Sequence, residues 1–135
     1  MKLPSDRAIL ERIYKLYYEE FQNHSGGENS GRRSKIYVPI DCKMIARDFD
    51  VDADIIFGRL YYHLQKKHGY TNENGSKVIF FDEVARDGRC INFPLMSSVL
   101  AGLQEDANKF RTATWISTCA LTVSIATAVF NVFFK

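Results

Sequence analysis

The residues best able to carry catalysis or to bind a metal are the histidines, the cysteines and a few paired acids. His24, His63 and His68 lack the spacing of a metal site, and the three cysteines include no Cys-x-x-Cys pair. The sequence has no serine or cysteine in a nucleophile elbow and no glycine-rich phosphate loop. Neighbouring acids such as Asp82 and Glu83 are more typical of a solvated face than of an acid–base couple. We therefore expect no enzyme, no catalytic residue, no metal and no cofactor.

The chain could also bind another macromolecule. The candidate residues for such binding lie between positions 53 and 68. If this stretch is a helix, its outward N-terminal positions hold Asp54, Phe57, Gly58 and Tyr61. Exposed Phe and Tyr resemble the aromatic anchors of protein interfaces. The phosphates of a nucleic acid would repel the carboxylate of Asp54. We expect these four residues to form a protein-interaction surface.

Nucleic-acid contacts are the alternative for the same region. Arg59 is the candidate for reading base edges, although it could instead pair with an acid such as Asp52, Asp54 or Glu73. Lysines at the C-terminal end of the helix would contact phosphate or interact favourably with the helix dipole. Arginines further along the chain would lie on a hairpin, where a DNA-contacting wing carries them. These candidate contacts are Lys66, Lys67, Arg86 and Arg89.

The distribution of charge does not favour nucleic acid. Residues 1–34 carry six basic and five acidic side chains, residues 35–75 carry six and six, and residues 76–111 carry five and five. No segment has the basic excess that marks a phosphate-binding surface.

The elements that would position these residues follow from local patterns. Ser5 is the expected N-cap of a helix over 6–21, and Pro39 places a strand over 35–40 at a sheet edge. Asp41 is the expected cap of a helix over 42–49, which precedes the helix over 53–68. Two apolar runs, 77–84 and 90–95, surround an Asp-Gly turn and predict a β-hairpin. A final helix is expected from residue 95.

The stretch from 45 to 64 resembles a helix-turn-helix unit. Its apolar residues fall where such units place their packing residues, and "FDVD" (49–52) stands where many have Leu-Gly-Val-Ser. The packing residues are Ile45, Ala46, Phe49, Val51, Ile56, Leu60 and Leu64. With the hairpin, the order resembles a winged helix-turn-helix domain of the α+β class. The resemblance covers roughly residues 5–96 and implies DNA binding, with the second helix in the major groove.

A run of 23 residues without a charge, 112–134, follows the head. As a helix it would extend about 34 Å, enough to cross a hydrocarbon core of roughly 30 Å. Lys109 and Arg111 precede the run, so the head is expected on the cytoplasmic side. The expected organisation is a winged-helix-like domain over 1–96, a connecting helix over 97–111 and a single C-terminal transmembrane helix over 112–134, which makes the chain look tail-anchored.

Small and hydrogen-bonding residues in this span recur at spacings of four and three. Such a seam lets membrane helices approach closely and predicts a homo-oligomer. The seam consists of Ala113, Ser117, Ala120, Ser124, Thr127 and Asn131.

Three functions are compatible with these features. The favoured one is a membrane-anchored, non-catalytic protein whose head mediates interaction with an unknown protein or self-association. The second is a membrane-tethered, DNA-binding transcriptional regulator. The third is a membrane-perturbing effector that acts through its oligomerising tail.

Overall fold

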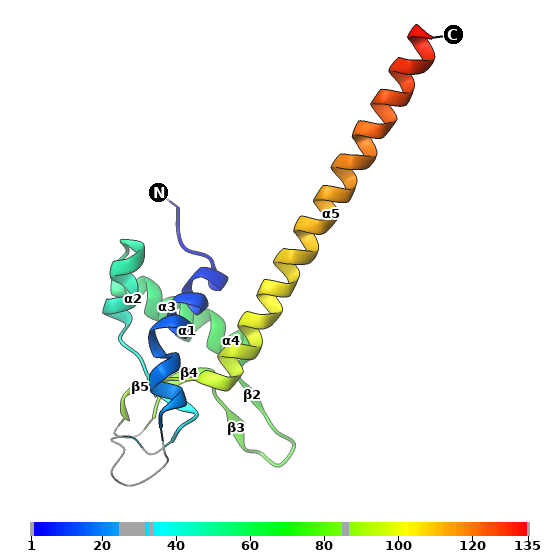
Figure 1. The fold of residues 1–135 in the computed structure, drawn as a ribbon. Helices are drawn as coiled ribbons and strands as arrows, with labels where there is room; N and C mark the ends of the chain where they lie inside the picture. Colours follow the sequence, from blue (N-terminus) through cyan, green and yellow to red (C-terminus); the bar gives the residue numbers. More distant parts are fainter. Residues whose placement is uncertain (1, 25–31, 33, 85–86, 135) are drawn as a thin grey trace. The chain divides into compact units, whose positions relative to one another are not determined.

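The computed structural model describes residues 2–24, 32, 34–84 and 87–134 (Figure 1). The chain divides into two compact units, Met1–Ala101 and Gly102–Lys135. The first is an α+β head with a small antiparallel sheet, and the second is helical. The α+β class expected for the head and the long apolar helix expected after it are both confirmed.

Helix α1, Asp6–Gln22, begins where the sequence predicts it. The hydroxyl of Ser5 accepts a hydrogen bond from the backbone N–H of Ala8 at 3.1 Å, which satisfies one of the free donors of the first turn. The helix buries Ile9, Leu10 and Ile13 completely. These apolar residues recur every three or four positions, so one face of α1 forms the centre of the core.

The predicted pair of helices is also present. Helix α2, Cys42–Phe49, is capped by Asp41, and α3, Ala53–Gly58, is capped by Asp52. Between them, Asp50 adopts a left-handed conformation with φ 52° and ψ 47°. Aspartate tolerates this conformation better than most residues do, so the chain can turn there without glycine.

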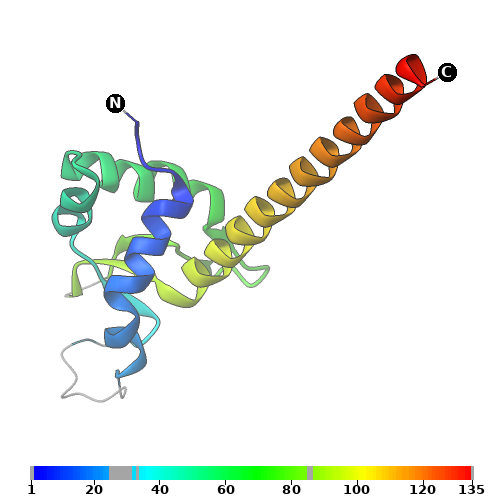
Figure 2. The ribbon, with the colours of Figure 1, turned by 45° about the horizontal axis from the view of Figure 1, so that its top comes forward.

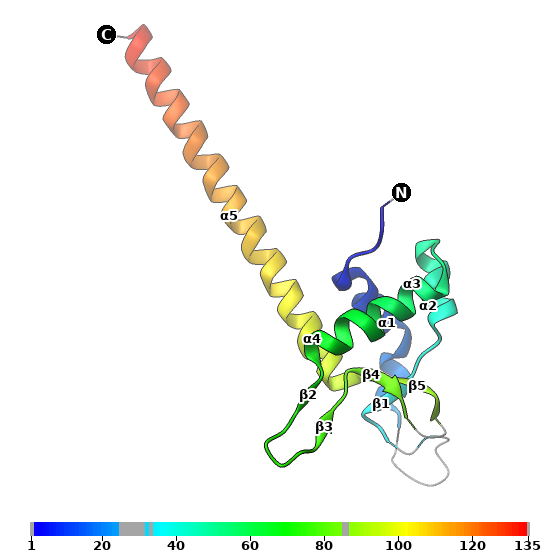
Figure 3. The ribbon, with the colours of Figure 1, turned by 180° about the vertical axis from the view of Figure 1, so that it is seen from behind.

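The second helix of the pair continues to residue 68, but its middle is wider than an α-helix. After α3 come the π-helical segment η1, Arg59–Gln65, and the short α4, Lys66–His68. Figure 3 shows this segment, drawn in green, in front of α1. The sequence pattern predicts a helix here and does not predict the π-helical turns.

The sheet differs from the predicted hairpin in its details. Strand β5, Arg89–Asn92, lies between β1, Tyr37–Pro39, and β4, Phe81–Glu83, and pairs antiparallel with both. The edge position of β1, predicted from Pro39, is confirmed. The hairpin across the Asp-Gly turn is present between β4 and β5.

The prediction of a single strand over 77–84 is wrong, because the structure divides this run into two strands. Strand β3, Lys77–Val78, pairs instead with β2, Tyr70–Thr71, in a separate two-stranded ribbon. The side chain of Gln65 accepts hydrogen bonds from the backbone N–H groups of Phe80 and Phe81 at the division. These donors face a helix rather than a neighbouring strand, so the ladder is interrupted there.

Helix α5, Phe93–Phe133, starts two residues before the expected position. Asn92 is the last residue of β5 and also caps α5. Its side-chain oxygen accepts a hydrogen bond from the backbone N–H of Leu95, as an N-cap does. In Figure 2 the first turn of α5 lies beside α1, where the ring of Phe93 stacks on Tyr14 and Phe21 at 5.4 and 4.6 Å between centroids.

Among the described residues, α5 is the one helix long and apolar enough to cross a membrane. None of the residues in its most apolar stretch is buried.

Candidate functional site

Three aromatic side chains of the segment 53–68 gather on the surface of the head. Phe57 and Tyr61 stack with ring centroids 5.4 Å apart, and Tyr62 meets Tyr61 edge-on at 5.2 Å. Phe81, which is fully buried, contacts Phe57 from beneath at 5.9 Å. Tyr62 is 70% exposed, so the cluster presents a large amphipathic ring to solvent. We call Phe57, Tyr61 and Tyr62 the aromatic cluster.

The π-helical turns explain why these three residues meet. In an α-helix, residues four and five positions after Phe57 differ in direction by about 100°, so only one of them lies above it. In a π-helix the hydrogen bonds join residues five apart and each turn is wider. Tyr61 and Tyr62 therefore both contact the ring of Phe57, at 5.4 and 6.1 Å. Such turns are frequent at functional sites.

Arg89 completes the surface from the sheet. Its guanidinium lies 4.2 Å from the centroid of the Phe57 ring, a cation–π contact. Glu83 stands directly opposite Arg89 in the β4–β5 ladder, yet within the described residues the two form no ion pair. A groove of about 290 Å³ opens between helix and sheet, lined by Phe57, Tyr61, Phe81, Asp82, Glu83 and Arg89.

A second hollow of about 260 Å³ lies on the other side of Arg89. It is bounded by the first turns of α2 and α3, including Cys42, Lys43 and Asp54. Burial raises the pKa of the Cys42 thiol, and the nearby charge of Arg89 opposes this effect only in part. Burial likewise raises the pKa of Cys90 to about 11. Both thiols are therefore protonated at neutral pH, which makes them poor nucleophiles.

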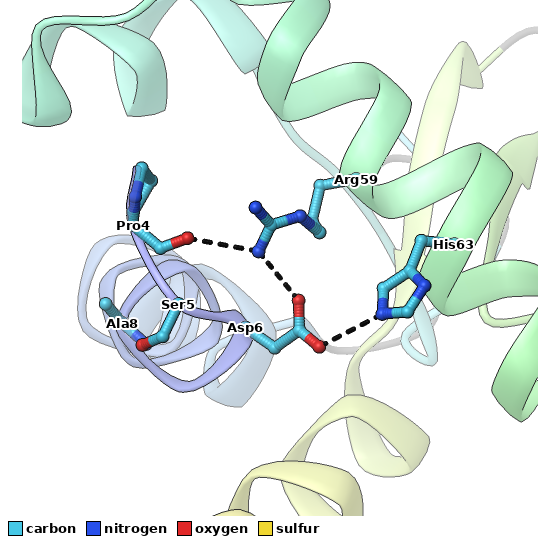
Figure 4. A network of polar contacts seen from close by, with 6 residues as sticks. All are labelled: Pro4, Ser5, Asp6, Ala8, Arg59 and His63. Atoms are coloured by element: carbon cyan, nitrogen blue, oxygen red, sulfur yellow. Dashed lines mark hydrogen bonds and ion pairs between the residues drawn. The ribbon is translucent and has the colours of Figure 1, made fainter. Parts of the chain in front are cut away.

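Arg59 turns away from the aromatic cluster toward α1 (Figure 4). Its guanidinium donates to the carbonyl of Pro4 at 3.0 Å and to the carboxylate of Asp6 at 2.9 Å. The other oxygen of Asp6 lies 3.2 Å from Nε2 of His63. Arg59 is therefore ion-paired rather than free, but the suggested partners Asp52, Asp54 and Glu73 are wrong, because α1 brings Asp6 beside it.

The candidate nucleic-acid contacts are not brought together. Arg59 engages α1, Arg89 stacks on Phe57, and Lys66 and Lys67 are exposed at the far end of the helix. Arg86 lies outside the described residues. The members of the predicted interaction surface, by contrast, lie near one another: Phe57 and Tyr61 line one groove, Asp54 lines the adjoining hollow, and Gly58 follows Phe57 in α3.

Three residues of this site escape prediction from the sequence. Tyr62 joins the cluster because of the π-helical turns, and Phe81 reaches it through tertiary packing. Asp6 takes part because α1 brings it beside Arg59. No local pattern in the sequence signals any of these contacts.

The predicted seam of the tail lies in the second unit, where its members are exposed. The hydroxyls of Ser124 and Thr127 bond back to the carbonyls of Ala120 and Val123, each at 3.0 Å. A hydroxyl satisfied by its own helix is inexpensive to place in lipid. The oligomer itself stays a prediction.

Among the described residues, no three His, Cys, Asp or Glu side chains converge as metal ligands would. No protein-family model matches the chain, and no significant similarity to a curated protein or to a solved structure was found. The function must therefore be inferred from the residues and geometry of the aromatic cluster and its surroundings.

Proposed function

We propose that this chain is a small, membrane-anchored, non-catalytic protein whose cytoplasmic, winged-helix-like head binds another polypeptide through the aromatic cluster. The observation that carries the proposal is the exposure of Tyr62, at 70%, in ring contact with Tyr61 and Phe57. Aromatic side chains already held by their neighbours lose little conformational freedom on binding, which is why they dominate interface hot spots.

The electrostatics of the site support a protein partner over DNA. Arg59, the one good candidate for reading bases, is held by Asp6 and the carbonyl of Pro4. Asp54 is exposed at the start of the helix that would enter the major groove, and the carboxylates of Asp82 and Glu83 line the groove beside it. Phosphates around such a site would be repelled rather than bound.

The anchor in this proposal is the apolar part of α5. Its residues 112–134 carry no charge, and Lys109 and Arg111 precede them. Basic residues that flank a span favour the cytoplasmic side, which would place the head there.

A photo-crosslinking experiment tests the proposed function. The full chain, in its native membrane, would carry benzoylphenylalanine in place of Tyr62 in one version and in place of Tyr70 in a matched control. Tyr70 is also an exposed tyrosine, at 54%, but it lies on the β2–β3 ribbon. We expect a discrete polypeptide adduct from position 62 and none from position 70.

Two results would count against the proposal. One is an absence of adducts at position 62, and the other is an adduct with nucleic acid. Sequence-selective retardation of DNA by the detergent-extracted chain, lost in Arg59→Ala, would favour the membrane-tethered regulator instead.

A further inference from the structure

The segment 53–68 has an inner line of residues that all face the core. Ile56, Leu60 and Leu64 are spaced by four and are each at most 1% exposed. In a regular α-helix, a spacing of four drifts by about 40° at each step, so the line from Ile56 to Leu64 would turn by about 80° across one apolar face. The wider turns of η1 rotate less per residue and counteract this drift. A spacing of four therefore describes one face of this particular helix.

The same geometry fixes the opposite face. Asp54, Gly58, Tyr62 and Lys66 are also spaced by four and lie two positions away from the buried line, so they point away from the core. Asp54, Tyr62 and Lys66 are all exposed, and a Cβ added to Gly58 would meet only the ring of Tyr62, at 3.8 Å. We call Asp54, Gly58, Tyr62 and Lys66 the outer stripe.

The outer stripe is complementary to a reversed copy of itself. It begins with an acid and ends with a base, and its two inner positions hold the smallest residue and a large ring. When two such helices lie antiparallel, Asp54 of each copy faces Lys66 of the other. The Tyr62 ring of each copy then faces the other copy's Gly58, beside which that copy's own Tyr62 ring already lies. A parallel arrangement would oppose like charges, Asp54 to Asp54 and Lys66 to Lys66. Antiparallel helix dipoles add to the preference.

We propose that the polypeptide bound by the head is a second copy of this chain, which docks through the outer stripe in a two-fold symmetric, antiparallel helix pair. This inference rests on the proposed function of the aromatic cluster, since Tyr62 belongs to both. A two-fold interface needs one patch that is complementary to itself, and the outer stripe has that property. Anchoring both copies in one bilayer would raise their effective concentration.

A charge-exchange experiment tests the pairing in the full chain. Two differently tagged copies are co-expressed, extracted in mild detergent, and one tag is captured while the other is quantified. Asp54→Lys on both copies makes the two facing positions of each contact basic, and Lys66→Asp on both makes them acidic. We expect either change to reduce co-capture about fivefold or more, because like charges that face each other in an interface are strongly unfavourable.

Combining the two variants gives the decisive measurement. When one tag carries Asp54→Lys and the other Lys66→Asp, both contacts of the pair become attractive again, and co-capture should return to the level of the unaltered chain. A variant that had merely failed to fold could not be restored in this way. Lys67→Asp is the matched control, since it makes the same change of charge one position off the outer stripe; it should leave co-capture unchanged.

The failure of this inference can be told apart from the failure of the proposed function. Any self-association through the tail contributes equally to every variant. Equal co-capture in all combinations would therefore overturn the helix pair. If the adduct from position 62 then joins a different polypeptide, the proposed function stands and only the identity of the partner is wrong. An adduct whose mass is twice that of the chain, attached near Gly58, would support the pair.

Discussion

At the scale of single residues, Gln65 links the long helix to the sheet. Its side-chain oxygen accepts hydrogen bonds from two consecutive backbone N–H groups, those of Phe80 and Phe81, the latter at 2.9 Å. Both residues are fully buried, so water cannot easily replace this acceptor. Gly69 lies against the same residue, and a Cβ there would come within 2.7 Å of the Gln65 carbonyl oxygen. The two residues together fix where the ribbon leaves the helix.

Replacing Gln65 with leucine tests the importance of this link. Leucine has a similar size but no acceptor, so two buried donors would lose their partner. We expect the free energy of unfolding to fall by about 1–3 kcal/mol for each unsatisfied donor, as measured by urea unfolding of the detergent-extracted chain. Gln22→Leu, at the exposed end of α1, is the control and should change stability little. A change equal to that of the control would show that the link is not needed.

At the scale of elements, the turn between α2 and α3 depends on one left-handed residue. The backbone N–H of Asp50 donates to the carbonyl of Arg47 and that of Val51 to Ala46, so the turn closes the end of α2. The φ of 52° at Asp50 is the only positive φ of a non-glycine residue in the described part of the chain. The direction in which the chain enters α3 depends in part on this torsion.

Two substitutions at Asp50 should therefore have opposite effects. Glycine adopts a positive φ freely, and Asp50→Gly is expected to raise the free energy of unfolding by about 0.5 kcal/mol. The strain energy that glycine removes from the folded state exceeds the free energy by which its flexibility stabilises the unfolded chain. Valine is branched at Cβ, and Asp50→Val is expected to lower it by about 1–2 kcal/mol. Thermal unfolding followed by circular dichroism measures both. Equal stabilities of the two variants would show that the turn relaxes to another conformation.

The elements that the sequence predicts well are those set by local chemistry. Ser5, Asp41 and Asp52 are caps whose partners lie two or three residues away, so their patterns can be read along the chain. The end of the ribbon at Phe80 involves a contact with a more distant residue, Gln65, whereas the β2–β3 ribbon is itself a local hairpin closed between Asn72 and Ser76. The predicted surface included Phe57 and Tyr61 but omitted Tyr62. The apolar spacing alone could not show that the helix widens.

At the scale of the whole molecule, the proposal requires that lipid, rather than protein, surrounds residues 112–134. The thiols provide a direct way to test this. Cys42 and Cys90 are buried in the head, whereas Cys119 is exposed on α5. Maleimides react with the thiolate, which forms readily only in water. A thiol within the hydrocarbon core of a bilayer is therefore protected although no part of the chain covers it.

We expect Cys119 to resist a charged maleimide in open membrane fragments, which admit the reagent from both sides. A cysteine introduced by Glu105→Cys, on the same helix but before the apolar run, should react within the same period, because Glu105 lies among charged residues. Cys42 and Cys90 should stay unlabelled in both samples, since burial raises the pKa of both thiols. Denaturing detergent should then expose all the thiols, which confirms that the reagent was active. Labelling of Cys119 as fast as of the cysteine at position 105 would mean that water reaches the middle of the apolar run, and the membrane anchor would have to be abandoned.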